Sequence, residues 1–260
     1  MKPEFDLHAT ARTALACLDL TSLNDHDTEA DVATLCQRAQ SPHGPVAAVC
    51  VWPRFAAFAR AHLPAHIAVA AVANFSDGSA DVERAVRDTS TIVHGGAQEV
   101  DVVLPFARLM AGDSAAVSRL LQAVRNACPG LTLKVILETG VLADSTLIAD
   151  AARLSLEHGA DFLKTSTGKT PVNATPQAAR LMLQAIASTP QAAGRVGFKA
   201  SGGIRSVADA VVYMDLCVEL LGAQALVPAR FRIGASSLLN DIEAMLDGRA
   251  KATHPARGAY

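Results

Sequence analysis

Short apolar runs alternate with longer segments of helical periodicity along most of this chain. In Asp27–Ala39, and again in Asp144–His158, apolar residues recur at intervals of about 3.6 residues. Thr175-Pro176 is a good helix start and Gly159 a good helix end. Between the helical segments lie eight apolar runs of β-forming type: Ala14–Leu20, Val46–Val51, Ile67–Ala73, Glu99–Leu104, Leu131–Leu137, Phe162–Leu163, Val196–Phe198 and Phe231–Gly234. The pattern therefore predicts eight strands that alternate with helices.

Alternating strands and helices indicate a parallel sheet with helical crossovers. A (β/α)8 barrel and an open doubly wound sheet both meet that description. The number eight favours the barrel, and so do the polar residues at or near the strand ends: Asp19, Cys50, Asn74, Asp101, Lys134, Lys164, Lys199 and Ser236. In a barrel these residues converge on the C-terminal face, where such enzymes have their active sites. An open sheet would spread them over several strand widths.

The length of 260 residues fits one barrel domain over 1–260, since (β/α)8 barrels typically have about 250 residues. Hydrophobic residues make up 50% of the chain and aromatic residues only 4%. The core must therefore consist largely of Ala, Val, Leu and Ile, which suit strands buried on both faces. The segment 247–260 is rich in small and basic residues, and we predict a flexible tail there. The expected fold class is α/β, a single-domain (β/α)8 TIM barrel.

The composition argues against several classes of protein. A net charge of −2 provides no basic surface for nucleic acid or an anionic membrane. The five cysteines are scattered without a CxxC pair, which argues against a disulfide framework and a zinc site. No GxGxxG motif follows the first strand to bind a dinucleotide. The N-terminal segment lacks a signal-peptide pattern, and no apolar run is long enough to span a bilayer. We expect a cytoplasmic protein with no metal and no nucleic-acid or membrane partner.

Lys164 and Lys199 are the residues most indicative of chemistry. Lys164 ends the sixth predicted strand in DFLKTSTGKT, and Lys199 ends the seventh in VGFKASGG. A lysine at a strand end is usually an exposed surface residue, but neighbouring barrel strands would bring these two side chains together. Repulsion between two ammonium groups and partial desolvation both favour the neutral amine on one of them. A neutral lysine attacks carbonyls, so the pair points to Schiff-base chemistry.

Asp101 and Lys134 are further charged candidates inside predicted strands. A carboxylate inside a barrel must be paired, or its pKa rises. Close to Lys199, Asp101 would stay ionised and could relay protons, directly or through water. The alternative for Asp101 is an ordinary polar strand residue that faces a helix. Which lysine perturbs which is left open by the sequence.

Gly/Ser-rich turns follow the last three predicted strands. They are KTSTGKT, with Thr167, Gly168 and Lys169; KASGGIRS, with Gly202, Gly203 and Arg205; and GASSL, with Gly234, Ser236 and Ser237. Backbone N–H groups at helix starts bind anions, and phosphate sites after the last two strands recur in this fold. A lone Gly-Gly pair can be a simple turn, but successive turns of this kind with basic residues nearby predict a phosphate site.

These motifs, taken in order, resemble the deoxyribose-phosphate aldolase family. They are LDLTSLN, AAVCVWPRF, EVDVVLP, LKVILETG, ADFLKTSTGK, GFKASGGIR and GASSLL, and they extend over nearly the whole chain. The resemblance implies a barrel enzyme that reversibly cleaves 2-deoxy-D-ribose 5-phosphate to D-glyceraldehyde 3-phosphate and acetaldehyde. It also implies that no metal or organic cofactor is needed. Members of the family often form dimers, so a homodimer is one expected assembly.

The resemblance assigns Lys164 as the Schiff-base lysine, Lys199 as the neighbour that lowers its pKa, and Asp101 as the acid/base partner. We predict as substrate-binding residues Asp19, Thr21, Cys50, Lys134, Thr167, Lys169 and Tyr260, the last being a terminal tyrosine of the kind that assists proton transfer in the family. The predicted phosphate-binding residues are Gly168, Gly202, Gly203, Arg205, Gly234, Ser236 and Ser237.

Three further features of the sequence bear on these assignments. A cysteine in the position of Cys50 is more often a small buried residue than a nucleophile. Ala200-Ser201 replaces the family's usual Pro-Ala, and we expect that change to loosen the backbone beside Lys199 and to alter fine specificity. Two rival functions also stay open: a Schiff-base aldolase for another phosphorylated sugar or keto acid, and a non-catalytic barrel that binds sugar phosphates.

Overall fold

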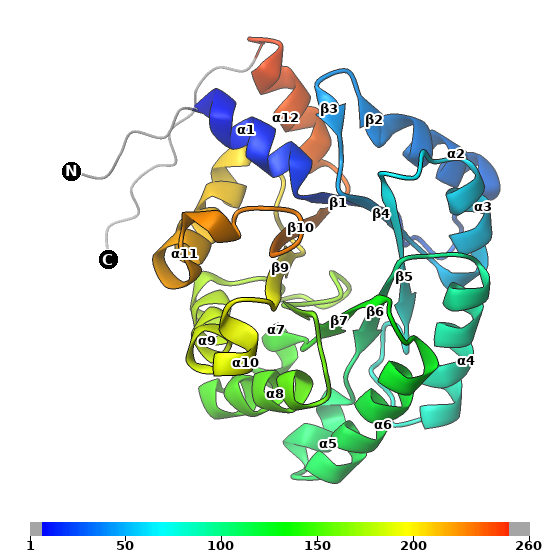
Figure 1. The fold of residues 1–260 in the computed structure, drawn as a ribbon, viewed down its shortest axis with the longest axis vertical. Coiled ribbons are helices and arrows are strands. Elements are labelled where there is room, and N and C mark those ends of the chain that lie inside the picture. Colours follow the sequence, from blue (N-terminus) through cyan, green and yellow to red (C-terminus); the bar gives the residue numbers. More distant parts are fainter. Residues whose placement is uncertain (1–6, 250–260) are drawn as a thin grey trace.

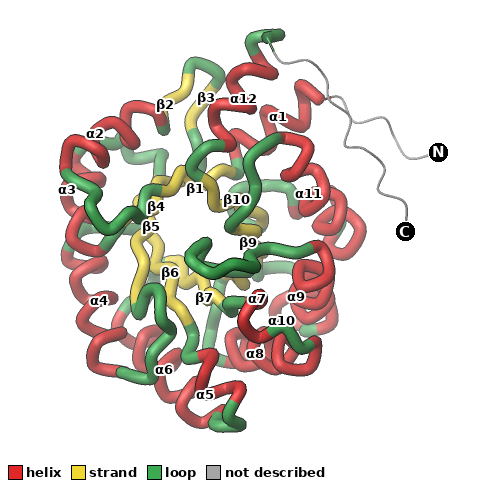
Figure 2. Tube along the Cα trace, turned by 180° about the vertical axis from the view of Figure 1, so that it is seen from behind, coloured by secondary structure: helices red, strands yellow, loops and turns green. Residues whose placement is uncertain are grey.

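The computed structural model describes residues 7–249. Within them, eight parallel strands form a closed barrel in the order β1-β10-β9-β8-β7-β6-β5-β4. Figure 1 shows this ring of strands enclosed by helices, and Figure 2 shows it from behind. The strands are β1 (Leu18–Thr21), β4 (Ala48–Val51), β5 (Ala68–Ala73), β6 (Glu99–Val103), β7 (Thr132–Ile136), β8 (Phe162–Lys164), β9 (Gly197–Ser201) and β10 (Phe231–Ala235). The predicted (β/α)8 barrel is thereby confirmed.

Helices surround the barrel: α1 precedes β1, α12 follows β10, and the others lie in the connections between successive strands. They are α1 (Leu7–Ala16), α2 (Glu29–Arg38), α3 (Ala56–Ala61), α4 (Val82–His94), α5 (Phe106–Met110), α6 (Ser114–Ala127), α7 (Thr139–Leu142), α8 (Ser145–Glu157), α9 (Pro176–Ser188), α10 (Pro190–Ala193), α11 (Val207–Leu221) and α12 (Leu238–Leu246). Single 3-10 turns lie at Pro53–Phe55 and Ala223–Ala225, and a small hairpin joins β2 (Gln40–Ser41) to β3 (Gly44–Pro45). None of the helices within residues 7–249 is long and apolar enough to cross a membrane.

The helix starts follow the local chemistry of the sequence. Thr175 accepts a hydrogen bond from a backbone N–H of the first turn of α9, and Pro176 occupies the first helical position, as predicted. Asp144 caps α8 in the same way. The predicted start of α2 at Asp27 is wrong by one residue, because Thr28 forms a capping box with Asp31.

The first predicted strand, Ala14–Leu20, is wrong in its first half. The structure continues α1 to Ala16, and β1 starts only at Leu18. Alanine is the strongest helix former, so the Ala-rich segment before Cys17 stays helical. In α1 it buries Ala11, Ala14 and Leu15 and packs against α11 and α12. The apolar run therefore spans the end of one element and the start of the next.

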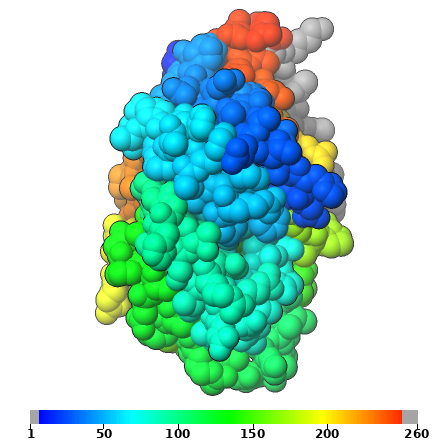
Figure 3. Space-filling model, turned by 90° about the vertical axis from the view of Figure 1, so that its right-hand side faces the viewer, coloured from blue at the N-terminus to red at the C-terminus, as the bar shows by residue number. Residues whose placement is uncertain are grey.

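Alternation along each strand separates the two sides of the barrel wall. On β6, Val100 and Val102 belong to the apolar layer between the strands and the helices. Glu99, Asp101 and Val103 occupy the alternate positions, which face the interior. The helices cover the outside of the wall, and in Figure 3 the side that is on the right in Figure 1 is formed mainly by the first half of the chain. The interior is thus the only place in this architecture where buried charged residues from several strands can meet.

The predicted flexible tail, 247–260, falls mostly outside the described residues. Asp247 is the C-cap residue of α12, and Arg249 is the last residue described. The rest of the segment, including Tyr260, lies beyond them, and the role predicted for this tyrosine stays a prediction.

Candidate active site

Three lysines from three strands converge on Asp101 inside the barrel. The Nζ atoms of Lys164 and Lys199 each donate to Oδ2 of Asp101 over 2.8 Å, and Nζ of Lys134 donates to Oδ1 over 2.7 Å. Strand register explains the meeting, because Asp101 pairs with Lys134 across β6 and β7 and Lys164 pairs with Lys199 across β8 and β9. The structure therefore brings Asp101 and both predicted catalytic lysines together. Lys199 lies in the middle of β9 and not at its end.

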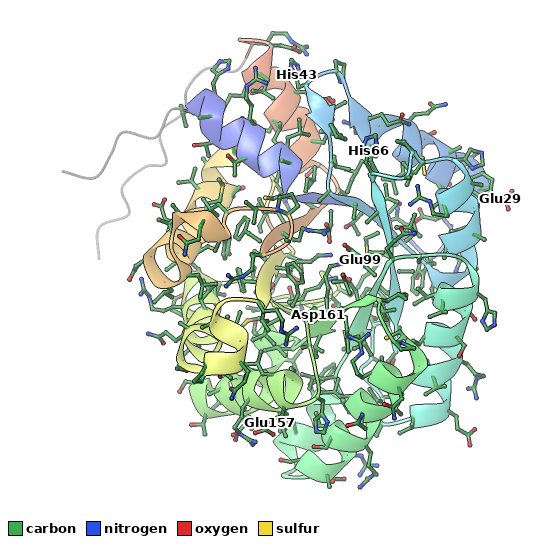
Figure 4. The ribbon with its side chains drawn as sticks, viewed as in Figure 1. Glu29, His43, His66, Glu99, Glu157 and Asp161 are labelled. Carbon is green, nitrogen blue, oxygen red and sulfur yellow. The ribbon has the colours of Figure 1, made fainter. Side chains whose placement is uncertain are left out.

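The ionic contacts continue towards the N-terminal end of the barrel through Asp19 and through two residues that the sequence did not single out, Glu99 and Arg232. Glu99 accepts from Lys134 over 2.5 Å and from Arg232 over 2.7 Å. Asp19, which lies within β1 and not after it, accepts from Arg232 and from Lys199 over 2.5 Å each. Figure 4 places Glu99 near the middle of the ring of strands. Period-two spacing from Asp101 would have indicated Glu99, and the same spacing from Gly234 would have indicated Arg232.

We call this continuous set of ion pairs the buried charge chain. Its members are Arg232, Glu99, Asp19, Lys134, Lys199, Asp101 and Lys164. All of them are buried. Such an arrangement is stable only where carboxylates and cations are matched, since an unpaired buried charge is costly.

Burial and charge act differently on the two lysines that share Asp101. For Lys164, burial is the largest influence and lowers its pKa; Asp101 raises it and Lys199 lowers it, and the result lies below the ordinary value. Burial also lowers the pKa of Lys199, but Asp101 and Asp19 together raise it above the ordinary value. Burial opposes ionisation of Asp101, yet the three lysines hold its pKa well below the usual range. Lys164 is therefore the lysine that gives up its proton most readily.

A cavity of about 350 Å³ opens above Lys164 at the C-terminal end of the strands. Ten of the residues predicted to bind substrate or phosphate line it with Lys164: Thr21, Thr167, Gly168, Lys169, Gly202, Gly203, Arg205, Gly234, Ser236 and Ser237. The predicted substrate-binding residues Asp19, Cys50 and Lys134 do not line it and are completely buried. Lys164 thus joins an open pocket to the buried charge chain.

The loop after β8 is anchored by a buried carboxylate. Glu138, which is fully buried, accepts from the backbone N–H of Thr167 over 3.2 Å and from the hydroxyl of Thr170 over 3.2 Å. Lys169 extends from this loop and donates to the backbone oxygen of Leu23 over 2.7 Å. Because Leu23 lies in the loop after β1, Lys169 bridges two sides of the pocket mouth.

Ser201, the second residue of the Ala200-Ser201 pair, makes hydrogen bonds to the segment that follows β8, and the loosening expected beside Lys199 stays a prediction. Its hydroxyl donates to the backbone oxygen of Ser166 over 2.6 Å, and the Ser166 hydroxyl donates back to the Ser201 oxygen over 2.5 Å. The backbone N–H of Ser201 also donates to the Thr165 hydroxyl over 3.0 Å. These bonds fasten the end of β9 to the end of β8, so the serine holds the two lysine-bearing strands in place.

Two glycines are required by close approaches at the pocket. A Cβ on Gly234 would lie 2.9 Å from Cβ of Ser201 and 3.0 Å from Cε of Lys199, so a side chain there would displace these two residues. Gly202 has a φ of +83°, and a Cβ there would lie 2.6 Å from the side chain of Asn173. Ser237 precedes α12 without a side-chain cap, which leaves the first N–H groups of that helix available to an anion.

Cys50 lies in an apolar cluster inside the barrel with residues such as Val72 and Ile136. Burial raises the pKa of its thiol, so it is not set up as a thiolate nucleophile. Among residues 7–249, no group of three or more His, Cys, Asp or Glu side chains is arranged to hold a metal ion. The ionisable chemistry of the pocket therefore rests on its lysines and carboxylates.

Comparison with known proteins gives a consistent result. The model of the DeoC/LacD family aldolases matches residues 13–244. The deoxyribose-phosphate aldolase of Agrobacterium fabrum is 46% identical over 241 residues, which cover 92% of each chain. The match to the family model includes all the strands that carry the buried charge chain.

Solved structures share the fold. A putative deoxyribose-phosphate aldolase from Toxoplasma gondii superposes with a TM-score of 0.84 at 26% identity, covering 94% of this chain and 96% of that one. A deoxyribose phosphate aldolase from Aeropyrum pernix, described as having a unique tetrameric structure, gives a TM-score of 0.70 at 26% identity, with 92% and 97% covered. With a lysine-lined pocket at the mouth of the barrel and a family model that spans nearly every element, the chain belongs to the DeoC/LacD family of aldolases and is a lyase.

Proposed function

We propose that this aldolase reversibly cleaves 2-deoxy-D-ribose 5-phosphate to D-glyceraldehyde 3-phosphate and acetaldehyde through a Schiff base on Lys164. The observation that carries the proposal is the position of Lys164, whose amine shares one carboxylate oxygen with Lys199 and lines the floor of the pocket. The named substrate of the Agrobacterium fabrum relative supports the choice of sugar phosphate.

The first half of the reaction forms the covalent intermediate. The neutral amine of Lys164 attacks C1 of the open-chain aldehyde, and loss of water from the carbinolamine gives an iminium ion. The lowered pKa of Lys164 favours this neutral amine. The iminium ion formed on the lysine is the electron sink, so this route uses neither a metal nor an organic cofactor.

The second half breaks the carbon–carbon bond. Asp101, acting through water or through Lys199, accepts the proton of the C3 hydroxyl. The C2–C3 bond breaks, its electron pair moves to the iminium to form an enamine, and glyceraldehyde 3-phosphate leaves. Protonation of the enamine carbon and hydrolysis of the new iminium release acetaldehyde and return the amine. Oδ2 of Asp101 lies 2.8 Å from Nζ of Lys164 and 2.8 Å from Nζ of Lys199, which fits such a relay.

The pocket supports a phosphorylated substrate. Lys169 and Arg205 supply positive charge, and the turns at Gly202-Gly203 and Ser236-Ser237 supply backbone N–H groups beside the uncapped start of α12. Thr21 lies on the wall formed by β1. We assign the phosphate to the side of β8, β9 and β10, and the reacting aldehyde to Lys164.

A direct assay tests the proposed function. The purified chain is incubated with 2-deoxyribose 5-phosphate, with fructose 1,6-bisphosphate and with a phosphorylated 2-keto-3-deoxy sugar acid, and aldehyde release is measured. Cleavage of the first alone is expected. Lys164→Arg should abolish cleavage although it keeps the positive charge, because arginine stays protonated.

The rival functions give other results in the same assay. Faster cleavage of fructose bisphosphate or the keto acid would identify an aldolase for that substrate. Binding of deoxyribose phosphate with no cleavage by the wild-type chain would identify a non-catalytic barrel. Either result would overturn the proposal.

A further inference from the structure

Lys164 is the surplus cation of the buried charge chain. The buried charge chain contains four cationic side chains and three carboxylates. The cations are Arg232, Lys134, Lys199 and Lys164, and the carboxylates are Glu99, Asp19 and Asp101. With every cation protonated, the buried charge chain would carry a net charge of +1. With Lys164 neutral, its net charge is zero. A buried chain of charges is most stable when it is balanced.

The hydrogen bonds identify the surplus member independently of the count. Both oxygens of Glu99 are occupied, one by Arg232 and one by Lys134. Both oxygens of Asp19 are occupied as well, by Arg232 and Lys199. Within the buried charge chain, Lys164 donates to one acceptor, Oδ2 of Asp101, and shares it with Lys199. The proton of Lys164 is therefore the one that the buried charge chain binds least firmly.

Other charged or ionisable groups near Lys164 do not change this count. The groups that face it are Asp101 from β6, Lys199 from β9 and Cys50 from β4, with Lys134 on β7 and Asp19 on β1 next to them. Within residues 7–249, Glu138 is the other buried charged side chain, and its recorded donors are Thr167 and Thr170 of the loop. Lys169 and Arg205 lie at the solvent-facing pocket.

We infer that Arg232 and Glu99, at the inner end of the buried charge chain, are positioning residues that set the protonation state of Lys164 without touching the substrate. Neither residue lines the pocket, and both lie on the opposite side of Asp19 and Lys134 from it. Arg232 contributes a charge that does not titrate and so fixes the number of protons that the lysines share. The inference rests on the proposed role of Lys164 as the nucleophile.

The two positions predict opposite shifts. In Arg232→Met with Lys164 neutral, only Lys134 and Lys199 would balance the three carboxylates. Protonation of Lys164 would restore the balance, so the pKa of Lys164 rises. Glu99→Gln removes a carboxylate, so Lys164 loses its proton more readily and its pKa falls. Arg232→Lys keeps the charge, and the double variant Glu99→Gln/Arg232→Met restores the balance. Both should behave like the wild type.

The pH dependence of kcat/KM measures these shifts, because its acid limb reports ionisation of the free enzyme. We expect that limb to move to higher pH in Arg232→Met and to lower pH in Glu99→Gln, by roughly one unit each. A purely structural role would lower activity without moving the limb, or would move it in one direction for both variants. An unmoved limb in both folded variants would overturn the inference.

A second measurement does not depend on aldolase activity. Brief acetylation with acetic anhydride at a series of pH values, followed by peptide mass mapping, gives the pKa of Lys164 directly, with Lys169 as an internal reference. The same opposite shifts are expected. If Arg232→Met does not fold, Glu99→Gln alone decides, and a pKa of Lys164 that stays unchanged or rises there contradicts the inference. Failure of the wild-type chain to cleave substrate would instead contradict the proposed function.

Discussion

At the scale of single residues, Asp101 links the pocket to the barrel interior. It is fully buried and accepts hydrogen bonds from three lysines, so its carboxylate is ionised in spite of its burial. An amide of the same shape would keep the packing and remove the charge. Two lysines would then retain carboxylate partners in Glu99 and Asp19, while Lys164 would have lost its recorded acceptor.

Asp101→Asn should therefore reduce both activity and stability. We expect kcat to fall by roughly 10² to 10⁴, because the proton relay is lost, and the free energy of unfolding to fall by about 3 kcal/mol, because buried cations lose a partner. Assay with 2-deoxyribose 5-phosphate and urea unfolding measure the two effects. Asp150→Asn, on the exposed face of α8, is the control and should change neither. A stable and active Asp101→Asn protein would contradict the role given to this residue.

At the scale of elements, short strand ends and tight loops position the pocket. The ends of β8 and β9 are fastened by Ser166 and Ser201, and the loop after β8 is held by Glu138. Gly202 allows the next loop to turn back against Asn173. A change in this turn should thus affect the phosphate end of the pocket more than the lysine end.

Gly202→Ala tests that division. The left-handed φ costs alanine about 1 kcal/mol, and the contact with Asn173 displaces the loop. We expect KM for 2-deoxyribose 5-phosphate to rise several-fold, with little change in activity on unphosphorylated 2-deoxyribose. Gly130→Ala is a matched control, because Gly130 has a φ of +80° with no atom within 4 Å of the added Cβ and lies before β7. Equal effects of the two substitutions on KM would contradict a phosphate site at this turn.

The elements also show where sequence reasoning succeeds and where it fails. The strands around Lys164, Lys199 and Asp101 were predictable, because each is a short run of mostly apolar residues whose charged side chains face inward. The boundary between α1 and β1 was not, since Ala14–Leu18 is an unbroken apolar run and its alanines favour a helix. The hydrogen bonds between Ser201 and Ser166 could not be predicted, because they depend on how the end of β9 lies against the loop after β8.

At the scale of the whole molecule, barrel closure makes the site. It brings β1 beside β10, and so allows Asp19 to contact both Arg232 and Lys199 from the far end of the chain. The convergence of charged residues followed from the expected barrel, but the identity of the inner pair did not. In the sequence Glu99 and Arg232 look like ordinary strand residues, and only the closed barrel shows that their side chains form ion pairs with each other, with Asp19 and with Lys134.

The central claim, that Lys164 forms the Schiff base, is tested most directly by trapping the intermediate. The enzyme is incubated with 2-deoxyribose 5-phosphate, reduced with borohydride, digested and mapped by mass spectrometry. We predict one covalent adduct, on Lys164, that requires substrate and is absent from Lys164→Arg. An adduct on Lys199 or Lys134, or none in an enzyme that cleaves the substrate, would contradict the account.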